Sequence, residues 1–243
     1  MVSRGGGRRW LWALLVIAVV AAGASLWLWR WYQRNGVSDS NLVIRRWLTD
    51  PGSHAELVTP GYVACPDAPF ILPSEGLVGL LYRDPAGPYD VLRPHTGVDI
   101  FGAGPSGTVP IVAAYEGWLT RLEGWRSTVI IRHEDPLQEG RTIWTYYTHM
   151  ANRDGTQAYI VEDFPPGTRE AYVEQGRLLG YQGEYNGDAF RVAMHLHFSI
   201  TTSDADGGFR NEAVLGNTLD PSPYLGLNVD FSTRPTFPIR CAS

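Results

Sequence analysis

The sequence contains no lysine, because all 20 of its basic residues are arginines. This absence excludes a Schiff-base mechanism and any nucleophile or base that relies on a lysine amine. The arginines are also unevenly distributed, since residues 47–243 carry 13 arginines against 24 aspartates and glutamates. An acidic body of this kind is poorly suited to binding phosphate backbones, and we expect no nucleic-acid partner.

Cysteine is almost absent too, with Cys65 and Cys241 as the only two in the chain. Neither has a second cysteine at CxxC spacing, which argues against a cysteine-ligated zinc site. The two lie near opposite ends of the region that carries the motifs described below, and the ends of a domain are often close in space. A disulfide between them would suit an oxidising compartment, whereas two free thiols are the alternative that the sequence leaves open.

One long apolar run is present near the N-terminus. Residues 10–29 contain no charged side chain, and a helix of that length spans a bilayer core of about 30 Å. Tryptophans stand at both ends of the run, as they do at membrane interfaces. We therefore predict a single-pass membrane anchor at residues 10–32, preceded by an arginine-rich cytoplasmic N-terminus at residues 1–9. A cleaved signal peptide is the competing interpretation, since Ala22-Gly23-Ala24 is an A-x-A site.

The rest of the chain divides into a linker, one domain and a tail. Residues 33–68 are dense in turn-forming residues, and we expect a linker with one short amphipathic helix at residues 42–48. Residues 69–226 have about the size of one ordinary domain, and residues 227–243 follow it as a C-terminal tail.

Within the domain, short apolar stretches alternate with glycine, and no long helical periodicity is present. The stretches with the length and composition of strands are residues 77–81, 98–101, 109–114, 118–122, 128–132, 142–147, 177–181 and 195–201. We predict a mainly β fold, an antiparallel β-sandwich or partly open barrel of short strands.

Histidines form the main functional signal of the sequence. His195 and His197 stand two residues apart in a run of strand-forming residues, and residues i and i+2 of a strand point to the same face of a sheet. Far upstream, three residues separate His95 from Asp99, and imidazole and carboxylate are both ordinary zinc ligands. His149 lies between these clusters, on a stretch rich in aromatic residues. A set of three such ligands keeps a fourth position open for water, which is typical of catalytic zinc.

The order H-x-x-x-D, single histidine, H-x-H resembles the zinc metallopeptidases of the LytM/lysostaphin type, the M23 peptidases. The resemblance covers about residues 69–226 and includes Asp220-Pro221-Ser222-Pro223-Tyr224-Leu225, which is similar to the usual ending of that family.

The resemblance implies distinct roles for the five side chains. His95, Asp99 and His197 would bind Zn²⁺, and His149 and His195 would stand beside the metal without binding it. One of these two would act as general base and the other would hydrogen-bond the oxyanion. The sequence leaves open which histidine takes which role.

The resemblance further implies an enzyme, a membrane-anchored zinc endopeptidase that hydrolyses peptide bonds in peptidoglycan stems or cross-bridges. It would sit in the cell membrane through residues 10–32, with its catalytic domain extracytoplasmic. One alternative is a non-catalytic regulator that binds and activates other cell-wall hydrolases, and another is a peptidase acting on extracellular protein. The intact ligand set favours the enzyme over the regulator. No oligomeric state follows from the sequence.

Two connections are longer than the family pattern, residues 152–172 after His149 and residues 184–194 before His195. Because each starts or ends at a candidate catalytic histidine, we expect both to form walls of the substrate groove. They carry aromatic and acidic side chains, namely Tyr159, Phe164, Tyr172, Tyr185, Phe190, Asp154, Glu162, Asp163, Glu170, Glu184 and Asp188. Acidic walls would favour a peptide with a free amine. The alternative is that the longer connection covers a sheet edge.

Overall fold

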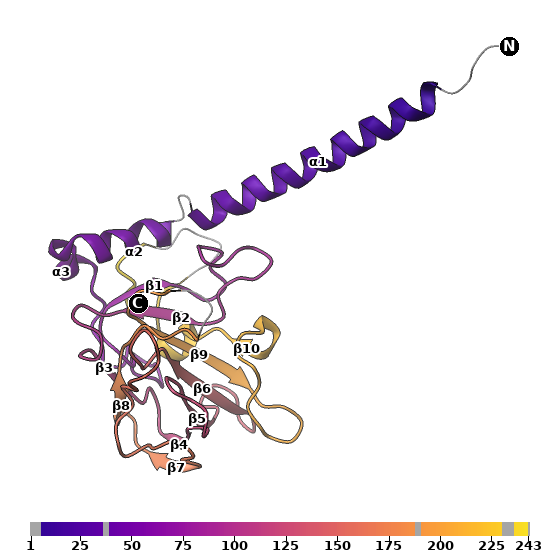
Figure 1. Cartoon of the computed structure of the whole chain (residues 1–243). Helices are drawn as coiled ribbons and strands as arrows, with labels where there is room; N and C mark the ends of the chain where they lie inside the picture. Colours follow the sequence, from indigo (N-terminus) through magenta and orange to yellow (C-terminus); the bar gives the residue numbers. More distant parts are fainter. Residues whose placement is uncertain (1–5, 36–38, 188–190, 230–235, 243) are drawn as a thin grey trace.

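The computed structural model describes residues 6–35, 39–187, 191–229 and 236–242. Its domain is built from short antiparallel strands, which confirms the predicted mainly β fold (Figure 1). The main path of an eight-stranded sheet runs β1 (Leu77–Leu80), β2 (Val98–Phe101), β9 (Leu196–Thr202), β6 (Thr142–Thr148), β5 (Val129–Glu134), β4 (Gly117–Thr120) and β7 (Ala171–Val173). Outside this path, the remaining strands are β10 (Thr218–Leu219), which pairs with β9, and the two-stranded sheet of β3 (Pro110–Val112) and β8 (Leu178–Tyr181).

The central strands direct alternate side chains to opposite faces of the larger sheet. Ile100 on β2 and Phe198 on β9 enter the main core and are fully buried. Burial of each such side chain stabilises the fold by about 1.5–3 kcal/mol. Asp99 and His197 each precede one of these core residues, so they face the other side of the sheet. The apolar core therefore determines the face on which the polar side chains stand.

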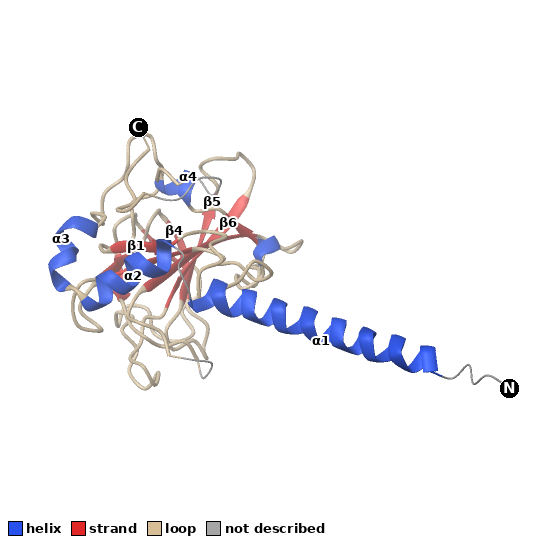
Figure 2. Ribbon diagram, turned by 90° about the horizontal axis from the view of Figure 1, so that it is seen from above, coloured by secondary structure: helices blue, strands red, loops and turns tan. Residues whose placement is uncertain are grey.

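α1 (Gly6–Asn35) projects away from the domain (Figures 1 and 2). Its segment Trp10–Trp31 is long and apolar enough to cross a membrane and is not buried within the structure. In the described part of the chain, it is the one helix with this property. A signal sequence has a similar composition, so the helix is compatible with either an anchor or a signal.

Residues 39–57, which the composition predicts as part of a linker, instead form short helices that pack on the domain. α2 (Asp39–Thr49) contains the predicted short helix and extends it, and η1 (Pro51–Ser53) and α3 (His54–Leu57) follow. Val43 and Trp47 lie four residues apart on the buried face of α2. They pack in one cluster with Leu77 and Phe101 of the β1–β2 pair.

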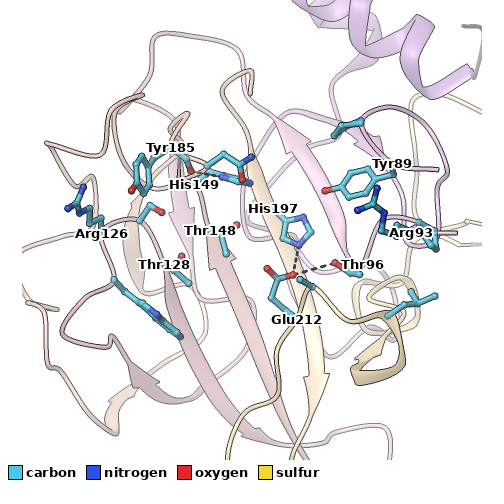
Figure 3. Close-up of a pocket in the computed structure, with 18 of the residues that line it drawn as sticks. Tyr89, Arg93, Thr96, Arg126, Thr128, Thr148, His149, Tyr185, His197 and Glu212 are labelled. Atoms are coloured by element: carbon cyan, nitrogen blue, oxygen red, sulfur yellow. Dashed lines mark hydrogen bonds and ion pairs between the residues drawn. The ribbon is translucent and has the colours of Figure 1, made fainter. Parts of the chain in front are cut away.

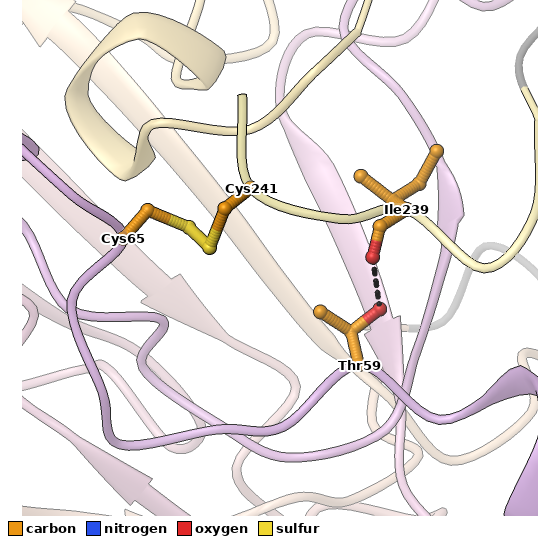
Figure 4. The surroundings of a disulfide bond; sticks show 4 residues. All are labelled: Thr59, Cys65, Ile239 and Cys241. Carbon is orange, nitrogen blue, oxygen red and sulfur yellow. Dashed lines mark hydrogen bonds between the residues drawn. A yellow bond between two sulfur atoms is a disulfide. The ribbon is translucent and has the colours of Figure 1, made fainter. Parts of the chain in front are cut away.

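Cys65 and Cys241 form a disulfide, with Cα atoms 5.4 Å apart (Figure 4). In the same region, Thr59 Oγ1 donates a hydrogen bond to the carbonyl oxygen of Ile239 at 3.0 Å. The segment predicted as a tail is thereby fastened to the start of the domain. The two short helical turns before it are η2 (Leu215–Asn217) and α4 (Ser222–Leu225).

Candidate active site

Strand register brings the candidate ligands together. Asp99 on β2 is the direct cross-strand partner of His197 on β9, and Thr148 on β6 is the partner of His197 on its other side. Directly opposite residues of antiparallel strands share a face. Gly97, just before β2, lies against β9 so closely that a Cβ atom there would meet the carbonyl oxygen of Phe198 at 2.3 Å. A glycine is therefore required for this approach.

His95, Asp99 and His197 form a buried cluster whose ligand atoms all lie within 4.8 Å of one another. Asp99 Oδ1 is 2.8 Å from His197 Nδ1 and 3.0 Å from His95 Nε2. The two imidazole nitrogens, His95 Nε2 and His197 Nδ1, are 2.9 Å apart. The structure thus brings together the three side chains that the sequence predicts as ligands.

Hydrogen bonds on the outer side of this cluster indicate which atoms carry protons. His95 Nδ1 lies 3.0 Å from the carbonyl oxygen of Leu81, and His197 Nε2 lies 3.2 Å from Glu212 Oε2. Both outer nitrogens face acceptors, so both carry hydrogen and donate. In neutral rings the inner nitrogens are then lone pairs that face a carboxylate, and only a positive charge between them relieves the repulsion. A metal ion or a proton on His197 can supply that charge, and the donor set of two imidazoles and one carboxylate fits zinc.

The electrostatics of the cluster agree with this arrangement. Burial raises the pKa of Asp99, but the neighbouring His95, His195 and His197 rings outweigh burial and hold that pKa well below its usual range. Burial lowers the pKa of His197, but Glu212 and Asp99 outweigh it and raise that pKa to about 10. A metal ion therefore has to displace a proton from His197, which makes metal binding dependent on pH.

His149 stands beside the cluster through an unusual backbone conformation. It directly follows β6, where strand alternation would point its ring to the core side with Tyr147. Its φ angle is instead 69°, in the left-handed region that a residue with a Cβ rarely adopts. His149 consequently lines the same groove as the preceding Thr148. Its Nδ1 lies 2.7 Å from the carbonyl oxygen of Tyr185 and donates to it, which leaves Nε2 as a lone pair.

His195 lies deeper than His149, and the two ring centroids are 4.4 Å apart. Its Nδ1 is 2.7 Å from the carbonyl oxygen of Ala193, and its Nε2 is 3.6 Å from Asp99 Oδ2. Burial lowers the pKa of His149 to about 3 and also lowers the pKa of His195. Both rings are neutral at pH 7 and able to accept a proton.

An open groove of about 1180 Å³ runs past these histidines (Figure 3). Thr96, Thr148, His149 and His197 line it, whereas His195 does not. Arg93 and Arg126 lie on opposite sides of His197 in this view. The other lining residues are Pro88, Tyr89, Asp90, Leu92, Pro94, Gly124, Trp125, Ser127, Thr128, Tyr185, Asn186, Gly187, Glu212, Ala213 and Leu215.

The expected walls of the groove are mostly wrong. None of residues 152–172, all of which the structure describes, lines the groove. This connection instead ends in β7, which pairs with β4 at the edge of the sheet, so the alternative of edge coverage is correct. From residues 184–194, only Tyr185, Asn186 and Gly187 line the groove, and Asp188 and Phe190 lie outside the described residues. The acidic walls are therefore absent from the described part of the groove.

Glu212 is the site residue that the sequence does not reveal. It lies in the connection between β9 and β10, far from every recognised motif, and only the fold brings it to His197. Arg93 and Arg126 were likewise without a sequence signal for the groove. A single charged residue in a loop has no periodicity or spacing that could indicate its partner.

The two remaining histidines, predicted to be surface or structural residues, lie outside the groove. His133 is buried between the carbonyl oxygen of Glu116 at 2.6 Å and Thr145 Oγ1 at 2.8 Å. Burial lowers the pKa of His133 to about 4. The His54 ring packs on Trp47, with centroids 4.1 Å apart.

No protein-family model matches the sequence, and no curated protein sequence matches it. Among solved structures, lysostaphin from Staphylococcus simulans matches with 23% identity and a TM-score of 0.35, over 57% of this chain and 46% of that one. A zinc containing peptidase from Vibrio cholerae matches with 18% identity and a TM-score of 0.32, over 55% and 31%. The catalytic domain of the prophage-encoded M23 protein EnpA from Enterococcus faecalis matches with 23% identity and a TM-score of 0.31, over 51% and 80%. The match spans less than half the length of the first two proteins.

Proposed function

We propose that the chain is a zinc-dependent peptidase whose reaction centre is His95, Asp99 and His197. One observation carries the proposal: three ligand atoms converge within 4.8 Å beside an open groove, and the outer nitrogen of each imidazole already has an acceptor. The H-x-x-x-D and H-x-H motifs, with their resemblance to M23 peptidases, support the same function.

Zinc, when bound, supplies a Lewis acid for the peptide carbonyl and lowers the pKa of a water molecule toward about 7. His149 lines the groove with a lone pair on Nε2, so it accepts the proton of the attacking water and passes it to the departing amine. His195 lies beside Asp99, and its Nε2, when protonated, donates to negative charge on the carbonyl oxygen. Water is thereby added across the peptide bond, with hydroxyl on the carbonyl carbon and hydrogen on the amine.

The charges of the groove favour a peptide that carries carboxylates. Arg93 and Arg126 are exposed on opposite sides of His197, and neither guanidinium contacts an acidic side chain in the described ranges of the chain. Guanidinium groups match carboxylates in geometry and charge. Asp90 and Glu212, the acids that line the groove, are already engaged by Arg30 and His197. The amine-bearing substrate expected from acidic loops is thus replaced by an anionic peptide.

The proposed substrate is peptidoglycan, in its stem peptides or cross-bridges, at the outer face of the cell membrane. The family resemblance of the motifs supports the substrate, and α1 supports membrane attachment. The regulator alternative is less favoured because all three ligand positions are present and converge.

Digestion of purified cell walls by the full-length protein in detergent, followed by mass analysis of the fragments, tests this function. New peptide ends that depend on added zinc and disappear with chelator are expected. Stimulation of another wall hydrolase without cleavage would instead support the regulator, and cleavage restricted to protein substrates would support the third function.

A further inference from the structure

Glu212 occupies the outer side of His197, opposite the cluster with Asp99 and His95. Its Oε2 lies 3.2 Å from His197 Nε2, and Thr96 Oγ1 donates to the same oxygen at 3.4 Å (Figure 3). The Glu212 side chain is 25% exposed and the His197 side chain 6%. The contact is therefore shielded from water on most sides, which strengthens the interaction of the carboxylate with the ring.

The two histidines of the cluster differ in what orients them. The outer nitrogen of His95 donates to the carbonyl oxygen of Leu81, a backbone group present whatever the side chain. The outer nitrogen of His197 has the carboxylate of Glu212 as its partner. The orientation and tautomer of His197 thus depend on a side chain that can be replaced, and the tautomer determines whether Nδ1 presents a lone pair to the cluster.

The loop around Glu212 is held on both sides by hydrogen bonds. Tyr146, on β6, donates its hydroxyl to the carbonyl oxygen of Arg210 at 2.5 Å. Asn211 Oδ1 accepts the backbone N–H of Ala213 at 2.9 Å. The backbone is therefore anchored immediately before and after Glu212, so the carboxylate reaches His197 from a fixed position. A metal ligand is oriented best when its outer partner is fixed in this way.

We infer that Glu212 is a positioning residue that holds His197 in the orientation and tautomer needed for binding the metal, and that it raises the affinity of the site for zinc. The inference rests on the proposed function for the identity of the metal. Glu212 is not itself a ligand in this arrangement, because it contacts the ring nitrogen on the side away from Asp99 and His95.

Zinc affinity of the full-length protein, measured by competition with a chelator of known affinity, tests the inference. Glu212→Ala should weaken zinc binding about 10–100-fold, the usual effect of removing an outer partner of a ligating histidine. Glu212→Gln should weaken it less, because an amide oxygen still accepts the Nε2–H. Glu139→Gln changes an exposed glutamate outside the groove and should bind zinc as the unaltered protein does.

Cobalt(II) in place of zinc provides a second readout that does not depend on turnover. The visible absorption bands of the cobalt form should change in Glu212→Ala, because His197 is no longer held in one orientation, and should be unchanged in Glu139→Gln. Thermal unfolding of each variant shows whether it is folded, and Glu212→Gln keeps the test decisive if Glu212→Ala is not.

Zinc affinity that is unaltered in both Glu212 variants would overturn the inference. Unaltered affinity with a raised KM would also overturn it, since Glu212 would then bind substrate. Asp99→Ala, measured in parallel, separates the two levels: retained zinc in Asp99→Ala refutes the metal site itself. Loss of zinc in Asp99→Ala with unaltered affinity in Glu212→Ala refutes only the role of Glu212.

Discussion

Asp99 and His197 face each other across β2 and β9, with Asp99 Oδ1 2.8 Å from His197 Nδ1. The pair joins two motifs that lie far apart in the sequence, and it supplies two of the three proposed ligand atoms. Asp99→Ala should remove both zinc and peptidase activity, because a two-histidine site loses its charge-neutralising ligand. Metal analysis of the purified variant gives the answer, and one zinc per chain in Asp99→Ala would refute the assignment.

His149 and His195 should behave differently from the ligands. His149→Ala and His195→Ala are each expected to keep zinc while turnover falls about a hundredfold or more, since proton transfer and oxyanion stabilisation each contribute about that much. Zinc content and kcat are measured on the same samples, with His54→Ala as a control outside the groove. Loss of metal in either variant would make that histidine a ligand.

The arginines of the groove should discriminate between charged and neutral peptides. Arg93→Gln or Arg126→Gln is expected to raise KM for a peptide with free carboxylates by up to about fivefold, because an exposed ion pair contributes about 0.2–1 kcal/mol. KM for the matching peptide with amidated carboxyl groups should stay the same. Arg45→Gln, an exposed arginine of α2 outside the groove, is the control. Equal effects on both peptides would argue against carboxylate recognition.

The Cys65–Cys241 disulfide joins positions separated by 176 residues and so closes most of the domain into one loop. The chain-entropy model gives such a loop a stabilisation of about 5 kcal/mol. Denaturant unfolding with and without reductant should show a loss of this size, and a Cys65→Ser/Cys241→Ser double variant should match the reduced protein. Thiol titration of the denatured, unreduced protein should find no free thiol, and two free thiols would contradict the bridge.

His133 should make stability depend on pH. Burial lowers its pKa to about 4 in the folded chain, below the value of about 6.5 of an unfolded histidine. The unfolded chain therefore binds more protons between these values, so stability is lost as pH falls from 6.5 toward 4, by up to about 1.4 kcal/mol per pH unit for this group. Unfolding free energies measured across this range should fall less steeply in His133→Gln. Identical slopes would show that His133 does not contribute.

Local pattern predicted the strands and the face on which the paired histidines stand. Strand periodicity depends on neighbouring residues, so the run ending in His195 and His197 indicated two imidazoles on one side of a sheet. The same local logic failed for residues 39–57, where turn-forming residues around α2 conceal the amphipathic stripe of Val43 and Trp47. It also failed for residues 152–172, because the direction in which a long connection leaves a sheet depends on packing rather than on its own composition.

The sequence by itself determined the mainly β fold, the apolar N-terminal helix and the candidate ligands, since these follow from period, length and residue type. Only the tertiary structure decided the partners of those ligands. Glu212 reaches His197 because β9 and the connection after it fold back over the sheet. His149 enters the groove because its backbone leaves the strand conformation. Such contacts join residues through the register of strands and the path of loops, and these depend on the packing of the whole chain.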